Sequence, residues 1–86
     1  MRLSELKELL GKDTEKSRYY YRQYPTLHRD LVLWEDYLTT VNSNRQKGIH
    51  RAKERARIAV LDRWIIGENT FYKIHQLLRD LCEDVP

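Results

Sequence analysis

The strongest structural signal in this chain is a row of large apolar residues spaced alternately four and three positions apart. The row consists of Leu27, Leu31, Trp34, Leu38 and Val41. Side chains at these intervals share one face of an α-helix, so the spacing predicts a long helix that begins near Thr26 and buries that face. The segment 42–44 (Asn-Ser-Asn) favours turns and caps, and predicts that this helix ends there and that Asn44 or a neighbour caps the next one.

Shorter helices are predicted before this one. Ser4 can cap a first helix that stops at Gly11, a residue that tolerates the left-handed conformation found at many helix ends. Asp13 or Thr14 can start a second helix, and Pro25 ends it because proline disfavours helical geometry at the residue before it.

A fourth helix is predicted after Gly48, which weakens its start. One stripe of this helix is formed by the apolar residues Ile49, Ala52, Ala56, Ala59 and Val60. The stretch Ile58–Ile66 is apolar nearly all round and predicts the buried centre of the protein.

A fifth helix is predicted at the carboxyl end of the chain. Gly67 is expected to end the fourth helix and Asn69 to cap the fifth. Its inner face consists of Phe71, Ile74, Leu77, Leu78 and Leu81. The tail, Glu83–Pro86, is expected to fray.

These patterns predict an all-α fold, a small bundle of four to five helices, in which residues 1–86 form a single helical domain. With 41% apolar residues, 34% charged residues, three Gly and two Pro, the composition is that of a compact helical protein. No apolar run approaches the length of a membrane span or resembles a signal peptide, so we expect no membrane association and a cytoplasmic location. A core this small often gains stability by association, which suggests a homodimer sharing the stripe that begins at Ile49.

The net charge of +3 is unevenly distributed along the chain. One acid, Glu54, stands among six basic residues, namely Arg45, Lys47, Arg51, Lys53, Arg55 and Arg57. The segment Arg45–Arg57 therefore has a net charge of +5, and the rest of the chain has a net charge of −2. Because arginine and lysine bind phosphates and release counterions from nucleic acid, the cluster predicts a DNA-binding helix, although a solvated helix face has the same pattern.

A second candidate surface is rich in tyrosine. It comprises Tyr19, Tyr20, Tyr21 and Tyr24, interleaved with Arg18 and Arg22. Neighbouring residues on a helix point about 100° apart, so three consecutive tyrosines cannot all face inward and at least one is exposed. Such a surface could stack on single-stranded nucleic acid or bind a host or phage protein, without any need for DNA.

We find no sequence support for catalysis, a metal site or a cofactor. The three histidines (His28, His50 and His75) are predicted on three different helices, and none has another histidine or a cysteine three or four positions away. Glu35 is expected with Asp36 on the solvated side of the third helix. Cys82 cannot form an internal disulfide, and we interpret it as a small core residue.

A helix-turn-helix is a further possibility near the end of the chain. If Gly67 is the turn glycine, Arg63 occupies the place that usually holds alanine and Lys73 the place that is usually buried, so the standard pattern fails twice. A looser relation remains open, in which the fourth helix is a scaffold and residues Asn69–Ile74 (Asn-Thr-Phe-Tyr-Lys-Ile) present polar side chains to a groove.

Two segments resemble a family of regulators. Tyr24–Leu31 (YPTLHRDL) is similar to the Tyr-Pro, His, Leu segment of RinA-type phage late-gene activators, and Ile58–Glu83 resembles the sigma-factor-like region of RinA- and ArpU-type regulators. The resemblance implies a phage or mobile-element origin and a role in transcription control. In these families a complete carboxyl-terminal helix-turn-helix follows, for which the residues up to Pro86 leave no room.

Overall fold

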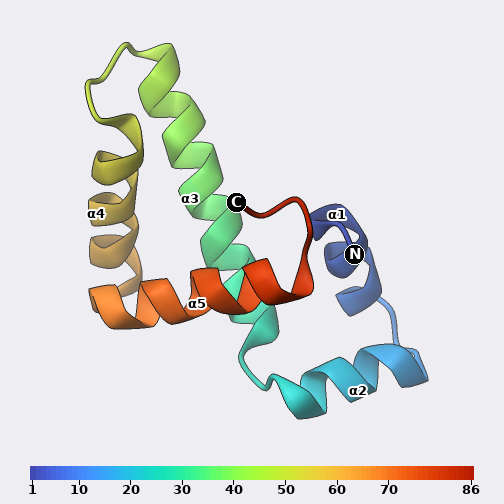
Figure 1. Ribbon diagram of the computed structural model, residues 1–86. Helices are drawn as coiled ribbons and strands as arrows, with labels where there is room; N and C mark the ends of the chain where they lie inside the picture. Colours follow the sequence, from blue (N-terminus) through green and yellow to red (C-terminus); the bar gives the residue numbers. More distant parts are fainter.

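The computed structural model describes residues 1–86 and contains five helices and no strand, which confirms the all-α prediction. The helices are α1 (Leu3–Leu10), α2 (Glu15–Gln23), α3 (Leu27–Gln46), α4 (Ala52–Trp64) and α5 (Glu68–Leu81). As Figure 1 shows, α3 and α4 form a hairpin, α5 runs across its base, and α1 and α2 lie at the other end of the molecule, which measures 44 × 24 × 19 Å. No helix is both long enough and apolar enough to span a membrane.

The first two helices begin by different means. Thr14 caps α2 in a reciprocal pair: its Oγ1 accepts a hydrogen bond from the Ser17 N–H (3.1 Å), and Ser17 Oγ accepts one from the Thr14 N–H (3.0 Å). Such a capping box satisfies two amides that the helix itself leaves free. The prediction for α1 was wrong in detail: Arg2, not Ser4, is the N-cap, and Gly11 ends the helix with a right-handed backbone (φ −79°).

The turn after α3 lies later in the chain than predicted. Asn44 caps no helix, because it lies inside α3, where its Nδ2 donates to the carbonyl of Ala52 (3.1 Å). The chain reverses over 47–51 instead, with Gly48 at φ 69° and Arg51 at φ 57°. Polar residues are tolerated in the last turns of an exposed helix, whereas Gly48 adopts the left-handed backbone that the reversal requires without steric cost.

The second half of α4 is not the buried centre that its apolar sequence predicted. Ile58 is 54% exposed and Ile65 is 91% exposed, whereas Ala56 and Val60 are fully buried. The reason is that α4 packs mainly against α3, so only one side of it is covered. The boundary with α5 also differs, since α4 ends at Trp64 and Gly67, not Asn69, is the N-cap of α5.

The core lies where α1, the first half of α3, α5 and the end of the chain meet. Its twelve buried members are Leu6, Leu10, Leu27, Leu31, Leu33, Trp34, Val60, Phe71, Ile74, Leu78, Cys82 and Val85. The interpretation of Cys82 as a core residue is confirmed, but the tail is not frayed: the Glu83 N–H donates to the Met1 carbonyl (2.9 Å), and the Leu3 N–H donates to Asp84 Oδ1 (2.8 Å).

The hairpin of α3 and α4 is held at its base by a carboxylate. Asp36 accepts two hydrogen bonds from Arg63 (2.9 and 3.1 Å) and one from Trp64 Nε1 (2.9 Å). Burial raises the pKa of Asp36, but the hydrogen bonds from Arg63 and Trp64 outweigh it and lower this pKa below its ordinary value. Asp36 is therefore a link between two helices and not simply a solvated residue, while Glu35 pairs with Lys7 of α1 (3.1 Å).

Candidate nucleic-acid interface

The basic cluster lies around the turn of the α3–α4 hairpin and along the first half of α4. Arg45 lies in the last turn of α3, and Lys47 follows in the connecting loop. Arg51 is the N-cap of α4, which carries the remaining three side chains, Lys53, Arg55 and Arg57. Arg55 and Lys53 line hollows on different sides of the hairpin.

Two of the six cations have carboxylate partners within the protein. Arg51 Nε lies 3.1 Å from Glu54 Oε2. Arg57 pairs with Glu68 at the start of α5 and stands 5.9 Å from the centre of the Tyr72 ring. The hydrogen bond with Glu68 raises the pKa of the Arg57 guanidinium. These two charges are therefore partly neutralised, and Arg57 helps to join α4 to α5.

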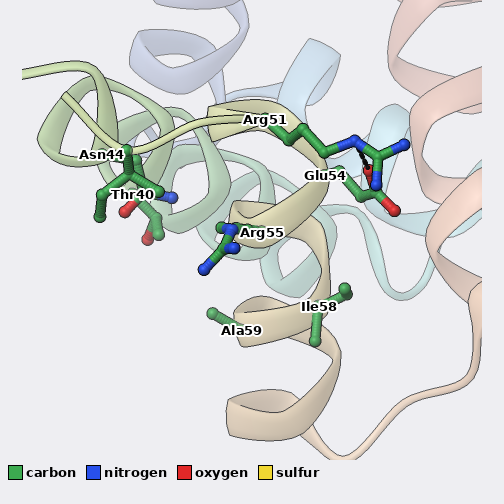
Figure 2. A pocket seen from close by; sticks show the side chains of 8 residues that line it. Thr40, Asn44, Arg51, Glu54, Arg55, Ile58 and Ala59 are labelled. Carbon is green, nitrogen blue, oxygen red and sulfur yellow. Dashed lines mark ion pairs between the residues drawn. The ribbon is translucent and has the colours of Figure 1, made fainter.

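The other four cations (Arg45, Lys47, Lys53 and Arg55) form no ion pair and are all exposed. Arg55 borders a hollow of about 550 Å³ between α3 and α4. Figure 2 shows Thr40 and Asn44 on the α3 side of this hollow, opposite Arg55 on α4. An unpaired guanidinium at the rim of an open hollow is free to bind an anion.

Arg45 and Lys53 converge on a second hollow, of about 370 Å³, beside α5. Its aromatic wall contains Tyr37 and the ring of His75, which stacks on Trp34 with 4.7 Å between ring centres. Burial raises the pKa of Tyr37, and the charge of Arg45 opposes this change. Two cations without ion pairs, from the consecutive helices α3 and α4, thus line the same hollow as His75 of α5.

The turn between α4 and α5 has a different register from the one assumed for a helix-turn-helix. Its left-handed residue is Ile65 (φ 53°), whereas Gly67 has an extended backbone (φ −86°). If the helix-turn-helix pattern is counted from Ile65 instead of Gly67, the position that is usually buried in the second helix falls on Phe71 instead of Lys73. Phe71 is 3% exposed. Leu61 then occupies the position that usually holds alanine, so the sequence still differs from the standard pattern there. Sequence alone gave no signal of this register, because isoleucine rarely adopts a left-handed backbone and a glycine stood two residues away.

The segment 69–74 divides between the core and solvent. Phe71 and Ile74 are buried, and Thr70 is half-buried. Besides Glu68, Arg79 and Asp80, four residues of α5 have exposed side chains, namely Asn69, Tyr72, Lys73 and Gln76. These four residues lie within the first nine of α5 and include amide and ammonium groups that can donate hydrogen bonds to base edges or phosphates.

The tyrosine-rich surface is partly used by the fold itself. Tyr20 and Tyr24 pack against the core, and Tyr21 donates its hydroxyl hydrogen to the carbonyl of Leu10 (2.9 Å). Tyr19 is 51% exposed, which confirms that the three consecutive tyrosines cannot all be buried. Of the two arginines, Arg18 pairs with Asp13 (3.0 Å) and Arg22 is exposed without an ion pair.

The histidines lie apart from one another, with His28 on α3, His75 on α5 and His50 in the loop before α4, not on a helix as predicted. No group of three or more His, Cys, Asp or Glu side chains is arranged to hold a metal ion. No protein-family model, curated protein or solved structure matches the chain.

Proposed function

We propose that this protein is a DNA-binding regulator of phage or mobile-element type that acts in the cytoplasm, in transcription control, as the resemblance to RinA- and ArpU-type regulators suggests. The observation that carries the proposal is the meeting of Arg45 and Lys53, neither of which has a carboxylate partner, at one hollow that His75 of α5 also lines. Uncompensated cations of this kind gain most from phosphates, because each neutralised phosphate releases condensed counterions.

The start of α4 adds to this positive field. Its first amides, those of residues 52–54, have no partner within the helix, and no side chain caps them. A free helix N-terminus carries a partial positive charge and favours anions. Lys47 and Lys53 flank this end, so the loop and the first turn of α4 can contact one stretch of DNA backbone.

In this proposal α5 is the helix that enters the major groove. It follows α4 after a short turn, and Asn69, Lys73 and Gln76 are exposed on its outer side. Asparagine and glutamine can pair with adenine, and lysine with guanine or phosphate. In helix-turn-helix variants with three helices, the loop between the first two contacts the backbone while the third reads bases, and loop 47–51 has the corresponding position before α4.

The test is binding of the purified protein to a mixed-sequence DNA duplex over a series of salt concentrations. Replacing Arg45 and Lys53 by alanine should weaken binding and reduce the slope of log K against log salt by about 2, since each phosphate contact contributes about 0.9. The matched control replaces Lys16 and Arg22, two exposed cations of α2 without ion pairs, and should leave the slope unchanged. Absence of binding by the wild type at low salt would reject the proposal.

That outcome would favour the second candidate, a host or phage protein bound through the tyrosine-rich surface. Its support is Tyr19, which is half exposed, stands edge-on to Tyr20 at 5.7 Å, and lies on the same helix as the unpaired Arg22. Partners captured from a host extract by the wild type should be lost with Tyr19→Ala. If capture is unchanged, this surface is not the contact.

A further inference from the structure

Two isoleucines, one on the outward face of α4 and one directly after this helix, are exposed to solvent. Ile58 is 54% exposed and Ile65 is 91% exposed. Ile65 is the C-cap of α4 and has a left-handed backbone (φ 53°), so the helical period does not fix the direction of its side chain, and Ile58 alone is assigned to this face. This face is opposite the buried residues Ala56 and Val60, which pack toward α3. Ala56 and Val60 belong to the stripe that begins at Ile49, and because they are buried these two residues cannot be shared with a second copy as predicted.

The same face carries one positive and one negative charge, both without a partner. Arg55 precedes Ile58 by three residues, and Asp62 follows it by four. Both side chains are exposed, and neither forms an ion pair within the chain. The face therefore has an apolar centre with a cation toward one end and an anion toward the other.

We propose that a second copy of this chain covers this face, with the two α4 helices packed antiparallel about a two-fold axis. When the axis passes between Ile58 and Ala59, each Arg55 lies opposite the Asp62 of the other copy. The two-fold symmetry repeats this ion pair, as it does every contact of an isologous interface. A parallel arrangement would instead place like charges side by side, which is unfavourable.

The antiparallel register also provides a place for Ile65. In this register Ile65 of each copy lies opposite Ala52 of the other. Ala52 is next to the hollow of about 550 Å³, whose apolar lining consists of Ile49, Ile58 and Ala59. Figure 2 shows Ile58 and Ala59 on the part of α4 that borders this hollow. Covering an exposed isoleucine is favourable, and this accounts for a large apolar residue at a position whose backbone would suit glycine.

The interface is small, because thirteen residues of α-helix are only about 20 Å long. We therefore expect a weak dimer that dissociates on dilution. The inference is independent of the proposed DNA binding. In the dimer Arg55 faces the other copy, and Arg45, Lys47 and Lys53 remain available to phosphates.

The test is a charge exchange followed by sedimentation without DNA. The wild type should dimerise at concentrations approaching millimolar, whereas Arg55→Asp and Asp62→Arg alone should each be monomeric, because each places two like charges together. An equimolar mixture of the two variants should form a heterodimer, since both opposed pairs are then of opposite sign. Circular dichroism verifies that each variant folds.

The matched control is Arg22→Asp alone, a charge reversal on α2, which should dimerise as the wild type does because its α4 face is unchanged. A wild type that stays monomeric at every concentration would overturn the inference. So would a mixture of the α4 variants that remains monomeric, or a wild-type dimer that both single variants leave intact. None of these outcomes bears on the salt dependence of DNA binding.

Discussion

Replacing Ile65 by glycine should stabilise the monomer, although it removes a large apolar side chain. Ile65 has a left-handed backbone (φ 53°, ψ 53°), which costs a residue other than glycine roughly 1–2 kcal/mol. The side chain is 91% exposed, so its removal loses almost no burial. The greater freedom of glycine in the unfolded chain offsets about 0.5–1 kcal/mol of this gain. We expect a net increase of about 0.5–1 kcal/mol in the free energy of unfolding.

For a domain of this size the gain corresponds to a rise in Tm of about 2–8 °C, measured by circular dichroism at a protein concentration too low for self-association. The control is the same substitution at Ile58, which is also exposed but lies inside α4. There glycine should lower the stability by roughly 1 kcal/mol, because it weakens a regular helix. If Ile65→Gly lowers Tm as Ile58→Gly does, the left-handed backbone at Ile65 is not a source of strain.

Three further predictions concern the core and the base of the hairpin. The pKa of Asp36 is lowered in the folded protein, so the stability that its carboxylate contributes is present above the ordinary pKa of 3.8 and is lost as the pH falls through the lower, folded value. In Asp36→Asn the free energy of unfolding should therefore depend less on pH in this range. An unchanged pH profile would contradict this. Burial raises the pKa of Cys82, which is 1% exposed, so a thiol reagent should modify it only at the rate of unfolding, and rapid labelling of the native protein would show otherwise. Val85→Ala should reduce the free energy of unfolding by roughly 1 kcal/mol in a denaturant titration, whereas a frayed tail would give no effect.

The sequence predicted the number and type of the helices because their apolar residues recur with the helical period. It was least accurate at the turns. Asn44 is a good capping residue, yet it lies within α3, because the left-handed backbone available to Gly48 determines where the chain reverses. A capping preference of about 1 kcal/mol does not fix a boundary when tertiary contacts favour a longer helix.

Burial along α4 could not be predicted from its composition. An apolar stretch in a sequence shows that burial is possible, but it does not show how many neighbours a helix has. The apolar stretch around Ile58 would have been buried if other helices had surrounded α4. In the structure α4 lies at the edge of the molecule, as Figure 1 shows, and Ile58 on this helix and Ile65 directly after it stay exposed.

The candidate site illustrates the same limit for charges. The sequence showed six cations close together and suggested a single phosphate-binding surface, but ion pairs form in three dimensions. Arg51 and Arg57 are matched by Glu54 and Glu68, and the helical period separates Arg55 from Lys53.

This separation gives α4 two independent chemical faces. On one side Lys53 lines the hollow that His75 of α5 also lines, and on the outward side Arg55 is followed seven residues later by Asp62, which has the opposite charge. If α4 only bound phosphates, a carboxylate in its second half would not help, because negatively charged phosphates repel a carboxylate. The position of Asp62 is therefore better explained by a protein surface than by DNA. Two copies joined through their α4 helices would each keep Lys53 and α5 free, so that association and DNA binding use different residues of the same helix.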